Sequence, residues 1–220
     1  MKEISRDSMG QAIYDRISAE LIAGRLRPNH KVTIRGLADT LGTSSTPVRD
    51  AVQRLLQDRA LEQRSMRDVR VPVPTAADYL EIATIRTELE GLAAARAAEI
   101  ADARDTARLG RLVQRNEEAM LARRWHSAAE FNQQFHFALA EIAGMPVMLD
   151  ILHRLWLRMG PLIAGYYASA EISPLQRHET ILAACEARDP ARARAAMRAD
   201  IEDGKEGILA YIASFTGKET

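Results

Sequence analysis

Residues with the chemistry of an ion site lie close together in one segment of this chain. Asn132 and His136 are four residues apart within FNQQFHFALAEIAG, a stretch with helical periodicity. At that spacing two side chains share a helix face, so an amide oxygen and an imidazole nitrogen can chelate one ion. The alternative is that His136 satisfies a hydrogen bond in a helical core. His126 and His153 have no partner at ligand spacing and are interpreted as surface or core residues.

A second group of residues has the chemistry of a DNA contact. Ser44, Ser45 and Thr46 stand directly before Pro47, and Arg49 follows two residues later. Hydroxyls and a guanidinium donate hydrogen bonds to phosphates and to base edges. The alternative is a solvated helix face, on which these residues bind water only.

The segment 33–59, TIRGLADTLGTSSTPVRDAVQRLLQDR, has the pattern of two short helices joined at a tight turn. Thr33 is a helix cap, and Gly42 can adopt the left-handed conformation that ends a helix. Ser44 or Ser45 caps the second helix, whose first turn tolerates Pro47. Its apolar stripe comprises Val48, Ala51, Val52, Leu55 and Leu56. The pattern predicts a helix-turn-helix whose second helix enters the major groove.

The flanking residues extend this motif to a winged helix-turn-helix over residues 1–74. Apolar residues at helical spacing predict a helix over 8–23, capped by Asp7 or Ser8 and ended by Gly24. After the motif, every second residue is apolar in the run Val69, Val71 and Val73. That alternation predicts a hairpin with SMRD at its tip, decorated by Arg64, Arg67 and Arg70.

Pro72, Pro74 and Thr75 mark a boundary, after which residues 75–220 form an all-helical part. The expected helices are 76–101, 104–122, 125–143, 146–170, 174–188 and 190–214. Pro161 lies inside the fourth of these and predicts a kink or break. Asp189 caps the last one ahead of Pro190. The predicted fold class is mainly α: an N-terminal winged helix-turn-helix and a C-terminal all-α six-helix bundle.

Charge is distributed unevenly along the chain, although the formal net charge is zero. Residues 1–74 hold 13 Lys and Arg against 9 Asp and Glu, a net charge of +4. Residues 75–220 hold 17 against 21, a net charge of −4. We expect only the basic front part to touch phosphates.

Composition indicates a cytoplasmic globular protein, with 47% hydrophobic and 27% charged residues. No apolar run approaches the roughly 20 residues of a membrane helix. The segment MKEISRDSMG lacks the apolar core of a secretory signal. The single cysteine, Cys185, excludes an internal disulfide and is expected to be a small buried residue on a helix.

Taken together, these motifs resemble the GntR family of transcriptional regulators, in its FadR-like branch with an FCD effector domain. The supporting segments are LADTLGTSSTPVRDAVQRLLQDRALEQ, IRTELEGLAAARAA, FNQQFHFALAEIAGMP and HETILAACEARDPARARAAMRADI. They span nearly the whole chain. The resemblance implies a homodimer that binds a palindromic double-stranded operator, usually as a repressor, and responds to a small carboxylate metabolite. It implies no membrane association and no enzymatic activity.

The family's DNA contacts correspond to Arg35, Thr46 and Arg49. Ser45 stands where the family usually has arginine, so one charged contact is missing. At the wing tip Asp68 replaces the usual glycine and repels phosphate. Arg67 and Arg70 remain expected contacts, together with Ser44 and Ser45.

The family's metal site, usually Asp, His, His and His, corresponds to Asn132, His136, His178 and Asp200. Two of the four are changed, and the mixed nitrogen and oxygen set suits Zn²⁺, Ni²⁺ or Mn²⁺ while leaving positions open for a carboxylate. Arg86 matches the position that faces the effector cavity, where a guanidinium can clamp a carboxylate. The alternative for Arg86 is a surface pair with Glu90 at i+4.

Two other functions could use the same four ligands. A metal-dependent enzyme would need a general base or nucleophile beside them, and Cys185 is on no recognised motif. A regulator that senses the metal alone would need no organic ligand. The sequence favours a ligand-responsive regulator and names neither its effector nor its operator.

Overall fold

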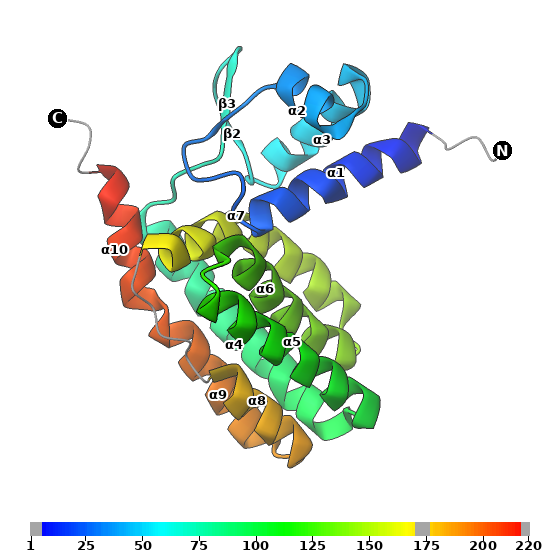
Figure 1. Cartoon of the computed structure of the whole chain (residues 1–220), viewed down its shortest axis with the longest axis vertical. Helices are drawn as coiled ribbons and strands as arrows, with labels where there is room; N and C mark the ends of the chain where they lie inside the picture. The colour runs from blue at the N-terminus through cyan, green and yellow to red at the C-terminus, as the bar shows by residue number, and fades with distance from the viewer. Residues whose placement is uncertain (1–5, 170–176, 217–220) are drawn as a thin grey trace.

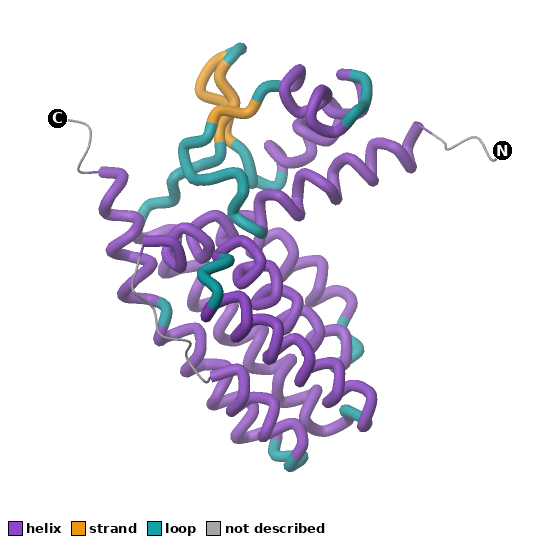
Figure 2. The backbone as a smooth tube through the Cα atoms, viewed as in Figure 1, coloured by secondary structure: helices purple, strands orange, loops and turns teal. Residues whose placement is uncertain are grey.

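The computed structural model describes residues 6–169 and 177–216 (Figure 1). A small N-terminal part with three helices and a sheet sits on one end of a larger bundle of helices (Figure 1). Within the described residues, strands occur only in the small part (Figure 2). The mainly helical fold, with a winged helix-turn-helix followed by an all-α bundle, is therefore confirmed.

The helix-turn-helix forms because local signals start and stop its helices where the sequence predicts. Thr33 Oγ1 accepts a hydrogen bond from Gly36 N at 3.1 Å, and Gly42 ends the first helix at φ +63°. Ser44 occupies the cap position of the second helix, but its side chain makes no capping hydrogen bond. The helices of this part are α1 (Arg6–Ile22), α2 (Ile34–Leu41) and α3 (Ser45–Gln57).

The predicted wing is present as a hairpin and gains a third strand. The strands are β1 (Lys31–Val32), β2 (Glu62–Ser65) and β3 (Asp68–Arg70), in the antiparallel order β1-β3-β2. Met66 and Arg67 form the turn, as the SMRD tip predicts. The last strand ends at Arg70 and does not reach Val73, because Val71 N and O bond to the His30–Asn29 loop instead. Two-residue β1 carries too little alternation to be seen in the sequence.

Seven helices follow in the described part of the chain. A capping box between Thr75 and Asp78 starts the first, and Asp189 caps the sixth ahead of Pro190, both as predicted. The first helix, α4, lies centrally and packs against α6, α7, α8 and α9. The bounds are α4 (Ala76–Ile100), α5 (Ala103–Leu121), α6 (Trp125–Ile142), α7 (Pro146–Ser169), α8 (Arg177–Glu186), α9 (Pro190–Asp203) and α10 (Lys205–Thr216).

Two predicted helices are wrong in detail. The last, 190–214, is split at Gly204, whose N–H bonds to Glu202 O and so interrupts the i−4 ladder between α9 and α10. The bundle therefore has seven described helices where six are expected. The break predicted at Pro161 is absent, since α7 continues through this residue as one helix. Residues 170 and 174–176 of the predicted helices lie outside the described residues.

The small part and the bundle are in direct contact. α1 packs against α7 and α6, and His126 Nδ1 lies 2.9 Å from the carbonyl oxygen of Ala23 at the end of α1. One hydrophobic core runs from α3 through α1 into the bundle. Among the described helices, none has the length and apolar character to cross a membrane.

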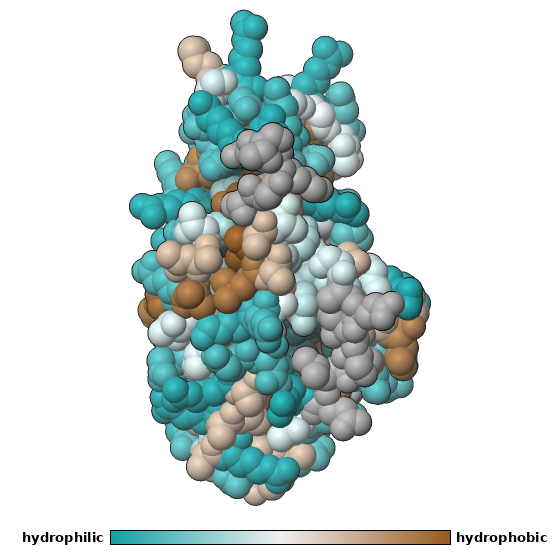
Figure 3. Space-filling view, turned by 90° about the vertical axis from the view of Figure 1, so that its left-hand side faces the viewer, coloured by the Kyte–Doolittle hydropathy of each residue, from teal (hydrophilic) through white to brown (hydrophobic). Residues whose placement is uncertain are grey.

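Apolar side chains also reach the surface of the bundle. Figure 3 shows a hydrophobic area at mid-height on one face, bordered by hydrophilic surface above and below. On α4, the side chains of Leu80, Ile85 and Leu92 are between 37% and 42% exposed. The central helix of the bundle thus presents apolar residues to solvent as well as to the core.

Candidate ligand site and DNA-facing surface

Three possible metal ligands converge from three different helices. His136 on α6, His178 on α8 and Asp200 on α9 offer ligand atoms that all lie within 4.8 Å of one another. His136 Nε2 is 3.4 Å from Asp200 Oδ2, and His178 Nε2 is 3.7 Å from Asp200 Oδ1. The fold therefore brings together residues that the sequence separates by up to 64 positions.

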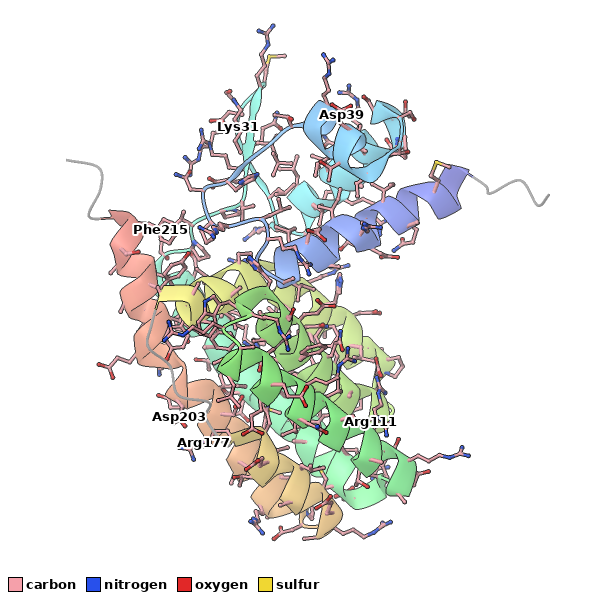
Figure 4. The ribbon with its side chains drawn as sticks, in the orientation of Figure 1. Lys31, Asp39, Arg111, Arg177, Asp203 and Phe215 are labelled. Carbon is pink, nitrogen blue, oxygen red and sulfur yellow. The ribbon has the colours of Figure 1, made fainter. Side chains whose placement is uncertain are left out.

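Local contacts hold α8 and α9 so that these side chains meet. Arg177, next to His178, forms an ion pair with Asp203, one helical turn after Asp200 (Figure 4). The His178 ring also stacks on Phe135 of α6, with ring centroids 4.3 Å apart. The ion pair joins α8 to α9, and the ring stack joins His178 to α6.

The cluster lines a cavity of about 90 Å³ inside the bundle. Asn132, one turn before His136 on α6, is buried and lines the same cavity, as does Arg86 of α4. The five residues that the resemblance assigns to the effector site therefore share one cavity. Tyr166 and Tyr167 of α7 also line it. Burial raises the pKa of Tyr167, so its hydroxyl stays neutral and can donate a hydrogen bond.

Arg86 and Glu90 form a buried pair, so the alternative of a surface pair is wrong. Their side chains are 5% and 1% exposed. Arg86 donates to Glu90 through Nε at 2.6 Å and Nη2 at 3.3 Å, and Trp156 Nε1 donates to the same carboxylate at 3.2 Å. The guanidinium carbon lies 4.2 Å from the centre of the Trp156 ring. Glu90 is thus held from two helices.

Glu90 also faces His136. Oε2 of Glu90 lies 2.5 Å from His136 Nδ1, on the opposite side of the ring from Asp200. The nitrogen and the oxygen are close but are not aligned for a hydrogen bond, so the contact is an ion pair. A continuous polar chain therefore runs from Arg86 through Glu90 and His136 to Asp200.

The charges in this chain shift the pKa values of its members in opposite directions. Burial lowers the pKa of His136, but the charges of Glu90 and Asp200 outweigh burial and raise it to about 9. Burial lowers the pKa of His178 to about 4. For Glu90 burial acts to raise the pKa, yet Arg86 and His136 hold it well below the ordinary range. At neutral pH the site holds a charged His136, a neutral His178 and ionised carboxylates.

The residues fit a divalent metal. Two ligand atoms about 2.1 Å from a tetrahedral metal lie about 3.4 Å apart, close to the two separations measured at Asp200. The Glu90 carboxylate lies 2.5 Å from the buried Nδ1 of His136, on the side of the ring away from Asp200, which is where carboxylates lie behind metal-binding histidines. Two imidazoles, a carboxylate and the Asn132 amide form a donor set that Zn²⁺, Ni²⁺ and Mn²⁺ accept.

The predicted DNA contacts lie at the end of the molecule away from the bundle. Figure 1 shows α2, α3 and the β2–β3 hairpin at this end. Six of the seven predicted residues are exposed and the seventh, Arg70, is half-buried. These seven are Arg35, Ser44, Ser45, Thr46, Arg49, Arg67 and Arg70.

The two wing arginines that are predicted to contact DNA differ in their surroundings. Arg67 lies in the exposed turn, whereas Arg70 Nε donates to Asp68 Oδ1 at 2.9 Å and Nη1 donates to Asn29 O at 3.1 Å. The negative charge of Asp68 is therefore partly neutralised by Arg70, two residues later in the same strand. Arg70 is tied to the protein, and Arg67 is the wing arginine that extends into solvent.

The sequence does not predict a place in the candidate ligand site for four residues, Glu90, Trp156, Tyr166 and Tyr167. The i+4 spacing of Arg86 and Glu90 is visible in the sequence, but it is the same in an exposed pair and in a buried one. Cys185 is buried as predicted, and burial raises the pKa of its thiol to about 11, so it is no nucleophile at neutral pH.

Comparison with protein families gives two matches along the chain. Residues 9–71 match the bacterial regulatory proteins of the gntR family. Residues 81–203 match the FCD domain. The two matches cover the winged part and the bundle in turn.

Individual relatives agree with these matches. The chain is 30% identical over 186 residues to the HTH-type transcriptional regulator McbR of Escherichia coli (strain K12), which covers 83% of this chain and 84% of McbR. A second relative is the "Probable D-xylose utilization operon transcriptional repressor" of Paenarthrobacter nicotinovorans, which is 36% identical over 92 residues. The matched segment is 42% of this chain and 41% of that relative. The solved structure of E. coli McbR/YncC superposes with a TM-score of 0.80, covering 92% of this chain and 97% of that one.

Proposed function

This chain belongs to the GntR family of bacterial transcriptional regulators and carries an FCD domain, and we propose that its bundle binds a small carboxylate through a divalent metal and thereby controls DNA binding. The protein is a transcriptional regulator, as its relatives are, and not an enzyme. The observation that carries the proposal is the cluster of His136, His178 and Asp200, which lines the bundle cavity and whose two histidines are buried.

In this proposal the metal is held by His136, His178 and Asp200, with the amide oxygen of Asn132 as a fourth donor. A metal bound there supplies open coordination positions for the oxygens of a carboxylate. Zn²⁺, Ni²⁺ and Mn²⁺ all suit such a set. The amide oxygen of Asn132 is the weakest donor of the four, because it lacks the charge of the carboxylate and is less basic than an imidazole nitrogen.

Arg86 is proposed to bind the carboxylate of the ligand. Its Nε–H and one N–H of Nη2 are engaged by Glu90, so both N–H groups of Nη1 and the second N–H of Nη2 remain for a molecule in the cavity. The contact with Trp156 and the pair with Glu90 hold the guanidinium in place before any ligand arrives. A fixed cation loses little freedom on binding, which favours affinity for a small acid.

The winged part is proposed to bind a palindromic operator as part of a homodimer. Two recognition helices α3, related by two-fold symmetry, would lie about 34 Å apart to read successive major grooves. The exposed apolar side chains of α4, Leu80, Ile85 and Leu92, support a second copy of the chain as the covering partner. Operator binding by such a dimer would repress transcription, and the protein would act in the cytoplasm, with the DNA.

An operator titration tests the proposal. The full chain, first treated with a chelator, is titrated onto a fluorescent duplex from upstream of its own gene, with a scrambled duplex as control. Further titrations add Zn²⁺, Ni²⁺ or Mn²⁺, and then the metal with a series of di- and hydroxycarboxylic acids. We expect sequence-specific binding that an acid changes only when metal is present. No preference over the scrambled duplex in any titration contradicts DNA regulation, and a response to metal alone contradicts the organic ligand.

A further inference from the structure

Glu90 lies behind His136, on the side of the ring that faces away from the donor cluster. We infer that Glu90 is a positioning residue for the metal site, which fixes the ring and the tautomer of His136 so that Nε2 is presented to the metal. This inference rests on the proposed function, because it assigns a role within the same site. Glu90 itself is no ligand, since its carboxylate faces the other nitrogen of the ring.

The geometry restricts where the proton of a neutral His136 can sit. With the proton on Nδ1, the positive end of the N–H bond lies beside the ionised Glu90 carboxylate, whose Oε2 is 2.5 Å from Nδ1, and this electrostatic contact is favourable without hydrogen-bond alignment. With the proton on Nε2, a nitrogen lone pair would face an anionic oxygen at the same distance, which is repulsive. The first tautomer leaves the Nε2 lone pair free, 3.4 Å from Asp200 Oδ2 and inside the donor cluster.

Glu90 can act in this way because it cannot turn away. Its carboxylate accepts two hydrogen bonds from Arg86 and one from Trp156 Nε1, and its side chain is 1% exposed. A buried carboxylate stays ionised only with such partners. Arg86 and Glu90 come from α4, His136 from α6 and Trp156 from α7, so three helices fix the orientation of one ring.

A pair serving only the stability of α4 would not need this arrangement. Arg86 and Glu90 would be satisfied by each other at i+4, just as Arg96 and Glu99 pair at i+3 on the exposed face of the same helix. The additional approach of His136, whose other nitrogen points into a cluster of possible metal ligands, indicates a function in the site.

The test compares the wild-type chain with Glu90→Gln, which keeps the shape of the side chain and removes its charge. Glu88→Gln is the matched control: it lies on the same helix and removes the same charge, but Glu88 is exposed and pairs with Arg194 and Arg198. Zn²⁺ affinity is measured by competition with a chromophoric chelator at a pH above the pKa of His136, so that loss of the Glu90 charge does not also change the competition between proton and metal. Folding of the full chains is checked by circular dichroism. We expect Glu90→Gln to lose about 10- to 100-fold in affinity and Glu88→Gln to bind like wild type.

A second measurement needs no variant at position 90. Nitrogen-15 NMR of the zinc-loaded wild-type protein reports which ring nitrogen of His136 carries the proton, and we expect Nδ1. A proton on Nε2, or a folded Glu90→Gln chain that binds Zn²⁺ as tightly as wild type, overturns the role of Glu90 while leaving the metal site intact. Absence of Zn²⁺ binding by the wild-type chain overturns the metal site itself, and with it this inference.

Discussion

Gly160 on α7 lies directly against Ile22 at the end of α1. A Cβ atom added at Gly160 would come within 2.4 Å of Ile22 Cα and 2.5 Å of its carbonyl oxygen. α7 is also the helix whose Ile163, Tyr166 and Tyr167 line the cavity of the bundle. α7 therefore borders the cavity and also contacts α1, the first helix of the winged part. A shift of α7 must then displace α1.

Replacing Gly160 by alanine tests this contact. We expect Gly160→Ala to destabilise the protein by about 1–3 kcal/mol, because the backbone of α1 has to move away from the added methyl group. The variant should also change the effect of the carboxylate ligand on operator affinity. Thermal unfolding and operator titration measure the two effects.

Gly110→Ala on α5 is the matched control. Its added Cβ would have Leu182 Cδ2 as its nearest contact, at an ordinary 3.7 Å. Alanine at this helical position should leave stability unchanged or raise it by roughly 0.5–1 kcal/mol. Equal unfolding temperatures for the two variants would contradict a tight junction at Gly160.

Metal binding is expected to release close to one proton at neutral pH. The pKa of His136, raised to about 9, means that its ring is charged before the metal binds and must lose a proton to bind it. His178, with a pKa lowered to about 4, is already neutral and contributes none. Affinity should therefore rise about tenfold per pH unit below the pKa of His136 and level off above it.

Calorimetry with Ni²⁺ in buffers of different ionisation enthalpy counts the protons released. A count near zero would mean that His136 is neutral in the metal-free protein, and a count near two would mean that His178 is charged as well. Either count contradicts the charge state described for the site.

Asn132→Asp is expected to tighten metal binding. The change replaces a neutral amide by a carboxylate inside the cavity, one turn from His136. A unit charge about 4 Å from another interacts by about 4 kcal/mol at an effective dielectric constant of 20, and desolvation cancels part of this, so a gain of roughly tenfold is reasonable. Chelator competition measures it, with Gln134→Glu on the same helix as control. Weaker binding by Asn132→Asp would show that Asn132 is no ligand.

Arg49→Ala should weaken operator binding by about 1–3 kcal/mol, because Arg49 is exposed on the first turns of the recognition helix α3. Arg111→Ala is the control, since Arg111 is an exposed arginine of α5 in the bundle (Figure 4). Fluorescence anisotropy at several salt concentrations gives both the affinity and the number of phosphate contacts. Unchanged affinity in Arg49→Ala would contradict the proposed orientation on DNA.

The elements predictable from the sequence are those set by local signals. Thr33, the Thr75–Asp78 box and Asp189 start helices because each satisfies nearby backbone N–H groups, whatever the rest of the chain does. The split at Gly204 is not visible in the sequence, because this glycine keeps right-handed helical angles, φ −75° and ψ −13°, and only its hydrogen bond changes. The amino-acid sequence of such a segment is the same kind of sequence whether the helix continues or is interrupted.

The candidate site was predictable only in part, for a related reason. The positions of Asn132, His136, His178 and Asp200 follow from the resemblance to a family, and the structure brings the last three within ligand distance. The burial of Glu90 depends on α6 and α7 covering α4, which no spacing along α4 reveals. Long-range packing thus decides which polar residues of a helix belong to a site.

The size of the cavity limits which acids leave the bundle undisturbed. At about 90 Å³ it is well below the roughly 300–1,000 Å³ of pockets that enclose drug-sized ligands. A compact acid of a few carbon atoms can enter without moving the helices. A bulkier acid has to spread the helices. Because α7 borders both the cavity and α1, the size of the metabolite would then determine how far the winged part moves.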